Sequence, residues 1–415
     1  MDAGRSSARD RPAPSALRRC VAVDAGTFAR EHWGSAALLS RAAELPKPFG
    51  DLLDLDAVDE LLSRRGLRTP FLRVVRNGEV IDSRQFTGPG GVGAEVADQV
   101  RDDQVMRLFA DGATVVLQGL HRVWPPLIDF VRRLGDELGH PCQANAYVTP
   151  ASSRGFSAHY DVHDVFVLQL AGSKHWTIHP PVHPDPLRDQ PWNQRAPTAA
   201  RGEPLIDTVL RPGDAMYLPR GFLHAATALG EVSAHLTVGV HVVTRFALVD
   251  ALFALLRDEP ELRRSLPVGI DAADPRQLAP HLRAVAEVLC GAVQAVQPEA
   301  VARAVRNRVW TGSRPEPVLP LAHAQFAGEL RAGDVVRWRA GLRCRTVDGT
   351  TLELPDRTIT LPDGTTRALR TLLNGAAVRV GALPELDGPA QLDLVRRLLR
   401  EGVLVPAGAD PAASP

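Results

Sequence analysis

Residues 112–243 contain many short runs of strand-forming residues, separated from one another by Gly and Pro turns. Typical runs are ATVVLQG, VFVLQLAG, HWTIH, AMYLP and SAHLTVGVHVV, and one helical segment, WPPLIDFVRRLGDEL, interrupts them. Many short strands joined by frequent turns are typical of a β-sandwich or a barrel. The pattern therefore predicts an α+β protein whose core is built from β-strands.

The segments before this region predict a short tail, then helices and a hairpin. Residues 1–20 are rich in Arg, Ser, Pro and Ala without periodicity, a composition that buries too little surface to offset the entropy cost of ordering the chain. We therefore expect a disordered tail there. From FAREHWGSAALLSRA to LDAVDELLSRRGL apolar residues recur at helical spacing, and PFLRVVRNGEVI then changes to strand character around an Asn-Gly turn.

After Thr244 the spacing of apolar residues becomes that of amphipathic helices. The end of the chain then combines strands (DVVRWR, LRCRTVDGTTLEL, RTITLP) with helices (TTRALRTLLNG, GPAQLDLVRRLLREG), an order that a winged-helix-like module accommodates. The predicted parts are a tail at 1–20, a β-rich domain at 21–243, a helical section at 244–328 and a winged-helix-like domain at 329–415.

The charges and cysteines argue against several classes of protein. Lys plus Arg and Asp plus Glu both total 48, so no overall positive field favours nucleic acid or an anionic membrane. The four cysteines stand far apart without a CxxC pair, which argues against a thiolate zinc site and a disulfide framework. No apolar run reaches the ~20 residues that cross a bilayer, and the first residues lack a signal-peptide core. We expect a cytoplasmic protein without a membrane segment.

The segment SAHYDVHDVF contains the first candidate metal ligands. In an extended segment residues two apart point to the same side, so His159 and Asp161 can present an imidazole and a carboxylate to one point. A His-x-Asp pair is common by chance, and a surface turn in which Asp161 bonds the backbone is the alternative. His163 shares their face if the strand stays straight, so it could replace or support a ligand. A third ligand is needed to favour a metal site.

The third candidate ligand lies in GDAMYLPRGFLHAA, where Gly213, Pro219, Gly221 and His224 follow the spacing G-x5-P-x-G-x2-H. This spacing resembles the second motif of the cupin superfamily, in which a strand runs into a Pro-Gly turn that re-aims the chain. His224 would then point into the mouth of the barrel. Two histidines and one carboxylate form the facial triad that holds Fe(II) and leaves positions for a co-substrate and oxygen.

Across this region the chain resembles the JmjC-type ribosomal oxygenases. The similarity is carried by NAYVTPASSRGFSAHYDVHDVFVLQLAGSKHWTIHPP, LRPGDAMYLPRGFLHAA and SAHLTVGV. The resemblance implies a double-stranded β-helix (cupin/JmjC) core and a protein hydroxylase that uses Fe(II), 2-oxoglutarate and O2. It also implies that His159, Asp161 and His224 hold the iron.

The same resemblance implies a set of contacts to 2-oxoglutarate. The family has a basic residue fifteen positions after the first metal histidine that binds the distal carboxylate, and Lys174 stands there; the alternative is a polar residue of the AGSK turn. Asn145 and Tyr147 match the family's Asn and Tyr, with a buried amide and a core aromatic as the alternatives. His235 and Thr237 share one face of SAHLTVGV and could close the pocket.

The resemblance also implies partners. In these oxygenases the middle helices form a dimer interface and the terminal module assists substrate engagement without reading DNA, so we expect a homodimer and no sequence-specific DNA binding. By analogy the substrate is a His or Arg side chain of a ribosomal protein. Another peptide, such as a biosynthetic precursor, stays open, and so does a non-catalytic cupin-like or DNA-associated protein. A lysine demethylase is disfavoured because the sequence has no zinc-binding Cys/His array.

Overall fold

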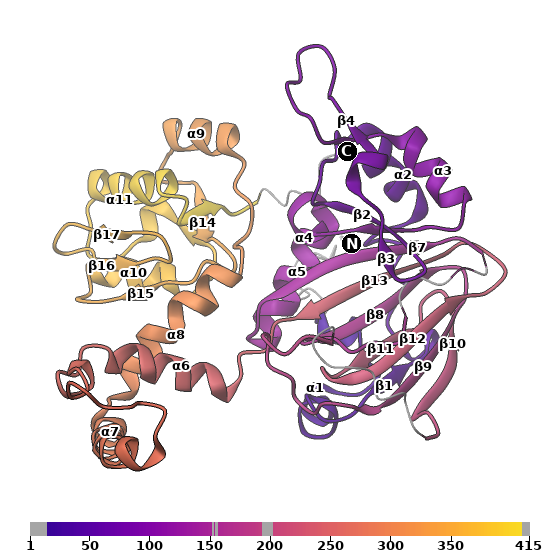
Figure 1. Cartoon of the computed structure of the whole chain (residues 1–415). Helices are drawn as coiled ribbons and strands as arrows, with labels where there is room; N and C mark the ends of the chain where they lie inside the picture. Colours follow the sequence, from indigo (N-terminus) through magenta and orange to yellow (C-terminus); the bar gives the residue numbers. More distant parts are fainter. Residues whose placement is uncertain (1–14, 152, 154–156, 193–201, 409–415) are drawn as a thin grey trace, which may run out of the picture. The chain divides into compact units, whose positions relative to one another are not determined.

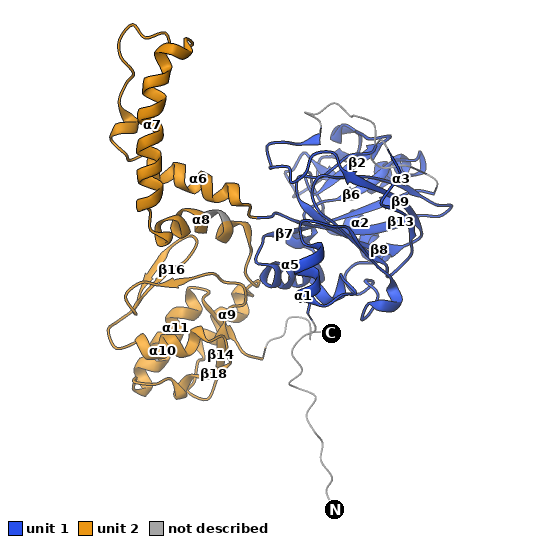
Figure 2. Cartoon of the chain, turned by 90° about the horizontal axis from the view of Figure 1, so that it is seen from below, with its two compact units in different colours: residues 1–242 blue, residues 243–415 orange. Residues whose placement is uncertain are grey.

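A computed structural model of the chain describes residues 15–408 apart from residue 152, residues 154–156 and residues 193–201 (Figure 1). The chain divides into two compact units, Met1–Val242 and Val243–Pro415, which Figure 2 shows in two colours. The division of the second unit into a helical section and a terminal module stays a prediction.

An eight-stranded antiparallel sheet forms the centre of the first unit, with the strand order β1-β11-β8-β13-β7-β6-β2-β3. Its strands are β1 (Leu38–Ser40), β2 (Leu72–Arg76), β3 (Glu79–Val80), β6 (Thr114–Leu117), β7 (Cys142–Thr149), β8 (Asp164–Ala171), β11 (Ala215–Leu218) and β13 (Ser233–Val240). Asn77 and Gly78 both have positive φ at the β2–β3 turn, as the Asn-Gly pair predicts.

A second, three-stranded sheet packs against the first. It consists of β10 (Ile206–Leu210), β9 (Lys174–Pro181) and β12 (Phe222–Ala228) in that order. Val167 of β8 and Ile178 of β9 belong to one buried apolar cluster, so the inner faces of the two sheets meet. Two facing antiparallel sheets of this kind confirm the predicted double-stranded β-helix. A small ribbon, β4 (Thr87–Gly88) with β5 (Gln99–Val100), lies outside both sheets.

Helices of the first unit cover the other face of the large sheet. They are α2 (Leu55–Arg64), α3 (Asp102–Ala110), α4 (Leu120–Val123) and α5 (Pro125–Leu138), whereas the three-residue α1 (Ala25–Thr27) contains no buried residue. The buried side of α5, which includes Phe130 and Leu134, joins Phe166 and Leu168 of β8 in a second apolar cluster. Because β8 is buried on both faces, its sequence VFVLQL is almost continuously apolar and does not alternate.

The prediction of a disordered tail over residues 1–20 is wrong at its end. Residues 1–14 lie outside the described residues, but Leu17–Arg19 forms a short 3-10 helix and Cys20 is fully buried. The Arg19 guanidinium donates to both carboxylate oxygens of Asp51, and Glu137 accepts from the main chain at residues 16 and 17. These charge-assisted bonds to distant residues stabilise a segment whose own composition does not.

The helical reading of FAREHWGSAALLSRA is also partly wrong. Helical turns extend from Ala25 to His32, but Leu38–Ser40 forms strand β1, which pairs with β11 at the edge of the large sheet. The free edge of β11 accepts this short extended segment, and that pairing has no local signal in the sequence.

The second unit contains four helices, then a small α+β part with two three-stranded sheets. The helices are α6 (Arg245–Leu256), α7 (Pro275–Ala295), α8 (Pro298–Gly312) and α9 (Pro320–Gly328). The sheets have the orders β18-β14-β19 and β15-β16-β17. Their strands are β14 (Val335–Trp338), β15 (Arg345–Thr346), β16 (Thr351–Glu353), β17 (Thr358–Thr360), β18 (Val378–Arg379) and β19 (Leu404–Pro406). Helices α10 (Thr366–Leu373) and α11 (Gly388–Arg400) share the apolar core of this part. Over the described residues, no helix is both long and apolar enough to cross a membrane.

Candidate metal centre and its pocket

The backbone itself brings the candidate ligands together. His159 lies in the segment before β8 and His224 lies on β12, and the two residues form an isolated antiparallel bridge. The His159 N–H donates to the His224 carbonyl at 3.1 Å, and the His224 N–H donates to the His159 carbonyl at 2.9 Å. The Gly221 N–H in turn donates to the Asp161 carbonyl at 3.0 Å. A reciprocal pair of main-chain bonds therefore fixes the spacing of residues that are far apart in the sequence.

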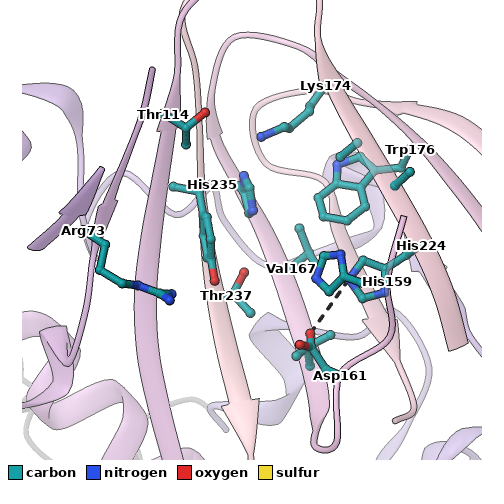
Figure 3. Close-up of a pocket in the computed structure, with 14 residues that line it drawn as sticks. Arg73, Thr114, His159, Asp161, Val167, Lys174, Trp176, His224, His235 and Thr237 are labelled. Carbon is teal, nitrogen blue, oxygen red and sulfur yellow. Dashed lines mark ion pairs between the residues drawn. The ribbon is translucent and has the colours of Figure 1, made fainter. Parts of the chain in front are cut away.

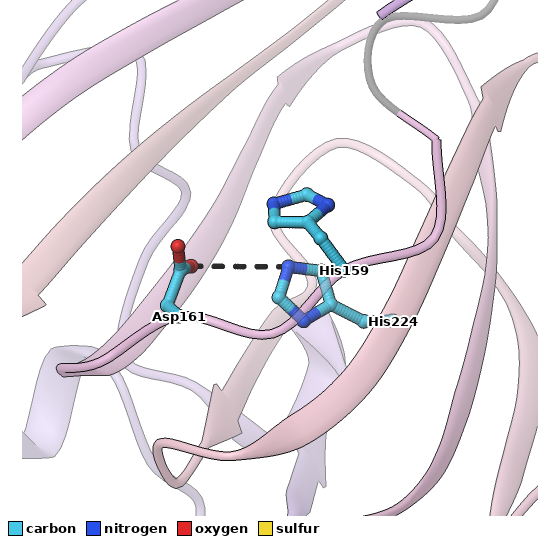
Figure 4. A group of neighbouring side chains, drawn as sticks. All are labelled: His159, Asp161 and His224. Carbon is cyan, nitrogen blue, oxygen red and sulfur yellow. Dashed lines mark ion pairs between the residues drawn. The ribbon is translucent and has the colours of Figure 1, made fainter. Parts of the chain in front are cut away.

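Their side chains converge on one point (Figure 4). One ligand atom from each of His159, Asp161 and His224 lies within 4.8 Å of the others, and Nε2 of His224 is 3.8 Å from a carboxylate oxygen of Asp161. Among the described residues this is the one cluster of three His, Cys, Asp or Glu side chains with such spacing. His163, the alternative ligand, is not part of the cluster, and its ring packs edge-on against His241 at 5.4 Å.

Main-chain carbonyls set the tautomer of both histidines. Nδ1 of His159 lies 2.8 Å from the carbonyl oxygen of Ser157, and Nδ1 of His224 lies 3.0 Å from that of Phe222. A carbonyl oxygen can only accept, so Nδ1 carries the proton in each ring and Nε2 keeps its lone pair. Both rings thus present the atom that binds a metal ion, and the donor set fits Fe(II).

The protonation states also suit a cation. Burial lowers the pKa of His224 to about 4, and the neighbouring His159 adds to this shift. Burial alone would raise the pKa of Asp161, but the charges of His163, His224 and His159 together lower it. At neutral pH the site therefore offers neutral His224 and ionised Asp161, which are the forms that a divalent metal needs.

A buried network holds the turn that carries His224. The carboxylate of Asp164 is fully buried and accepts from the Tyr217 hydroxyl at 2.5 Å and from the Arg220 N–H at 3.1 Å. The Arg220 guanidinium also forms an ion pair with Asp185 at 2.9 Å. Because Arg220 stands between Pro219 and Gly221, these bonds fix the Pro-x-Gly turn against β8.

The candidate ligands line a cavity of about 280 Å³ between the two sheets, which also contains a buried cation (Figure 3). Lys174, at the start of β9, is 3% exposed, and its Nζ donates to Oγ1 of Thr149 at 3.1 Å. Burial lowers its pKa to about 8. No carboxylate of the described residues forms an ion pair with Lys174. Burying an unpaired charge costs free energy, and a bound carboxylate would offset that cost. The cavity thus contains a buried cation next to the three candidate metal ligands.

Three further predicted residues line the same cavity. The ring of His235 stacks on Tyr147 with centroids 5.0 Å apart and meets Trp176 edge-on at 5.4 Å. Nδ1 of His235 is buried without a hydrogen-bond partner, and burial, with the charge of Lys174, lowers its pKa well below the usual value. Thr237, two residues along β13, lies on the same face.

Asn145 is placed differently from the other predicted contacts. It is not among the residues that line the cavity, and its side-chain oxygen accepts from the Gly119 N–H at 3.0 Å. Gly119 precedes α4 and has a positive φ. Asn145 thus connects β7 to the start of α4, and its contact with a co-substrate stays a prediction.

Sequence reasoning missed several residues of the cavity wall. Trp176 could have been inferred, because it lies two residues from Lys174 on the same strand. Thr149, the partner of Lys174, likewise lies two residues from Tyr147, although it does not line the cavity. Thr114 of β6 lies 3.3 Å from Thr149 through the two hydroxyl oxygens. Arg73 of β2 also lines the cavity, although nothing in its local sequence marks it as a pocket residue.

A family profile described as JmjC domain matches residues 128–248, which include all three candidate ligands and Lys174. The chain thus contains a JmjC domain over these residues. Enzymes with this domain use Fe(II), 2-oxoglutarate and O2, and the donor set and the buried Lys174 of this chain fit the iron and the co-substrate.

Known proteins are similar over more than half of the chain. Ribosomal oxygenase 1 of Gallus gallus is 31% identical over 271 residues, which cover 61% of this chain and 43% of that protein. The bifunctional lysine-specific demethylase and histidyl-hydroxylase NO66 of Aedes aegypti is 26% identical over 279 residues, or 63% of this chain and 42% of that protein. The chain thus spans less than half the length of these curated relatives.

Solved structures extend the fold similarity to nearly the whole chain. The ribosomal oxygenase YcfD of Escherichia coli in complex with cobalt and 2-oxoglutarate is similar with a TM-score of 0.56 at 18% identity, covering 94% of this chain and 99% of that one. Another structure of E. coli YcfD has a TM-score of 0.57 at 18% identity, covering 92% and 98%. The chain therefore shares the fold of YcfD.

Proposed function

We propose that this chain is an Fe(II)- and 2-oxoglutarate-dependent protein hydroxylase. The observation that carries the proposal is a single cavity that contains both the His159, Asp161 and His224 cluster and the buried Lys174 ammonium. A metal-only site would not need a desolvated cation, and a carboxylate-binding pocket would not need the three metal ligands. Together they fit an iron ion and an acidic co-substrate side by side.

Bound Fe(II) would supply the activation of O2, with 2-oxoglutarate oxidised to succinate and CO2 as a C–H bond of the target is hydroxylated. His159 and His224 present Nε2 and Asp161 presents a carboxylate. Lys174, which Thr149 orients, holds the distal carboxylate of 2-oxoglutarate. Tyr147, His235 and Thr237 close the co-substrate pocket, and Asn145 on β7 supports it by holding Gly119 at the start of α4. The apolar walls, which include Val165, Val167 and Trp176, exclude water from the reacting groups.

We infer that the target is a protein side chain, a His or Arg of a ribosomal protein. Support comes from the relatives, whose names are ribosomal oxygenase 1 and histidyl-hydroxylase, and from the near-complete fold similarity to E. coli ribosomal oxygenase YcfD. The same chemistry on another peptide or a biosynthetic precursor is the second candidate. A non-catalytic binding protein would retain the fold but would have no use for Lys174 beside three metal ligands.

The enzyme acts as a cytoplasmic homodimer in this proposal, because ribosomal proteins are the targets and the second unit carries apolar helix faces. The 21-residue helix α7 contains no buried residue, and Leu282, Val285 and Val293 on it are exposed. The described cysteines are all free, which agrees with a reducing compartment. The winged-helix-like end assists substrate engagement and does not read a DNA sequence.

Two measurements test the proposal. The purified protein with Fe(II), 2-oxoglutarate and O2 should release succinate in step with hydroxylated peptide, and the His224→Ala variant should release none. Mass spectrometry of ribosomal proteins from cells with and without the gene should show one oxygen atom on one residue that depends on the gene. If no ribosomal protein shows such a difference, the proposed ribosomal target is wrong. If the protein neither binds nor consumes 2-oxoglutarate, the proposed enzyme activity is wrong.

A further inference from the structure

Arg73 lies at one end of a row of side chains that crosses the large sheet. Arg73 of β2 pairs with Val116 of β6, Val116 pairs with Tyr147 of β7, and Tyr147 pairs with His235 of β13. Directly paired residues of antiparallel strands point to the same face. The Arg73 side chain is therefore on the cavity face of the sheet, and Figure 3 shows its guanidinium extending into the cavity.

The guanidinium of Arg73 has no acidic partner in the part of the chain that the structure describes. Arg73 is half-buried, and its Nε is buried without a hydrogen-bond partner. Its charge acts on Tyr147, where it opposes the rise in pKa to about 12 that burial causes. Arg76, three residues along the same strand, instead approaches the Asp111 carboxylate at 3.9 Å and does not line the cavity. A cation whose donors point into a pocket is built to meet an acceptor.

That acceptor is not the carboxylate that Lys174 holds. Lys174 donates to Thr149, and the Thr149 hydroxyl is hydrogen-bonded with that of Thr114. Thr149 lies on β7 and Thr114 on β6, each two residues away from the row that contains Arg73. The two cations thus face the cavity from different positions, with His235 between them (Figure 3). The ring of His235 stacks on that of Tyr147. With the distal carboxylate assigned to Lys174 and the 2-oxo acid end of 2-oxoglutarate assigned to the metal, Arg73 faces the space that remains for the target side chain.

We propose that Arg73 selects the target residue by donating hydrogen bonds to an acceptor on its side chain. A neutral imidazole nitrogen or a carboxamide oxygen meets this requirement, whereas a guanidinium or an ammonium group has donors only and carries a like charge. The enzyme therefore takes histidine- or asparagine-like targets and rejects arginine. This assignment rests on the proposed protein hydroxylase and narrows its target.

The first test observes Arg73 directly and needs no turnover. The full chain, loaded with Zn(II) and 2-oxoglutarate and labelled with ¹⁵N-arginine, is titrated at neutral pH with the N-acetyl methylamides of histidine, asparagine and arginine. The Nε–H signal of Arg73, assigned by its loss in Arg73→Gln, should shift with the first two probes and not with the third. If the Arg73 signal does not shift with any of the three probes, or shifts equally with the arginine probe, the proposed role of Arg73 in target selection is wrong.

The second test measures selectivity with the Fe(II) enzyme on peptide pools that differ in one central residue, His, Asn or Arg. Wild type should add oxygen to the His or Asn pool and leave the Arg pool unchanged. Arg73→Glu should lower turnover of the preferred pool roughly 10- to 100-fold and favour the Arg pool. The control, Arg76→Gln, removes a charge from the same strand and should retain the wild-type preference and the wild-type affinity for 2-oxoglutarate.

The two tests separate the two proposals. If the Arg73 signal responds to the probes but no pool gains oxygen, the hydroxylase proposal fails and the binding role of Arg73 stands. If the pools gain oxygen with the same preference in wild type and Arg73→Glu, the hydroxylase stands and the role of Arg73 fails. A weaker 2-oxoglutarate affinity in Arg73→Gln with unchanged selectivity would reassign Arg73 to the co-substrate.

Discussion

Each candidate histidine ligand has its tautomer set by a carbonyl two residues before it in the chain. Ser157 performs this role for His159 and Phe222 performs it for His224. Such local bonds leave both Nε2 atoms ready to bind a metal ion, so little reorganisation is needed. Asp161 then provides the one negative charge of the set.

Replacing that charge should affect the metal more than the fold. Asp161→Asn keeps the shape of the side chain but removes the carboxylate, so we expect Fe(II) affinity to fall by roughly 100-fold or more. Calorimetric titration with Mn(II) in place of iron under anaerobic conditions measures it. The control Asp207→Asn removes a surface carboxylate that pairs with His175, and its metal affinity should equal that of wild type. Equal affinities of both variants would contradict the assignment of Asp161.

Lys174 should give 2-oxoglutarate binding a pH dependence. Its pKa of about 8 means that the ammonium is present below pH 8 and is lost above it. We expect the affinity for 2-oxoglutarate to fall up to about tenfold per pH unit above that point. Lys174→Met should weaken binding by about 2–5 kcal/mol and remove this pH dependence, while metal binding survives. Isothermal titration with 2-oxoglutarate at several pH values on either side of 8 measures the affinity of wild type and of Lys174→Met. A wild-type affinity in Lys174→Met would contradict the role of Lys174 in binding 2-oxoglutarate.

The same pKa predicts how stability changes in the absence of ligand. In the unfolded chain Lys174 has its ordinary pKa of 10.5, so between about pH 8 and 10.5 the unfolded state binds more protons than the folded state. Stability therefore rises with pH through this window as far as Lys174 is concerned. The difference in unfolding free energy between wild type and Lys174→Met, measured with urea at several pH values, should follow this sign.

At the level of elements, the Pro-x-Gly turn between β11 and β12 decides where His224 points. Gly221 has a φ of +87°, and a Cβ there would lie 2.3 Å from the His183 carbonyl oxygen. Gly213, at the other end of the motif, has a φ of +92°, and its Cβ would lie 2.9 Å from Ala42. The motif thus needs glycine for both its backbone conformation and the close approach of neighbouring chain.

Gly221→Ala should therefore damage both the fold and the metal site. Backbone strain alone costs about 1–3 kcal/mol, and the contact with His183 adds to it by forcing the turn to move. The control is Gly230→Ala. Gly230 also has a positive φ, but a Cβ added there would have no atom within 4 Å. We expect Gly221→Ala to lose more stability in urea and to bind Mn(II) more weakly than the control. Equal losses in both variants would mean that the close contact has no effect.

At the level of the whole molecule, the second unit should mediate self-association. Helix α7 contains no buried residue although apolar side chains recur along it. An apolar face of this extent is typical of an interface. Leu282→Glu should therefore shift a dimer to a monomer in light scattering at micromolar concentration, whereas Arg283→Gln, the adjacent exposed position, should not. A wild-type monomer would contradict the proposal.

The candidate ligands could be predicted from the sequence because each depends on short-range geometry. His159 and Asp161 stand two apart on an extended segment, and the G-x5-P-x-G-x2-H turn re-aims the chain at His224. The family resemblance added Lys174, and the alternation of side chains along β13 placed His235 and Thr237 on one face. The β-rich core was predictable for the same reason, since strand runs and turn residues are local signals.

Only the tertiary structure decided which distant segments complete the pocket and close the core. Arg73 and Thr114 reach the cavity because β2 and β6 extend the sheet beside β7, while Asn145, on the same strand as Tyr147, bonds to Gly119 instead. Likewise β1 and the segment at residues 15–20 gain their order from β11, Asp51 and Glu137. Pairing between strands and burial of charged groups depend on partners far along the chain, and local periodicity carries no information about which partner a segment meets.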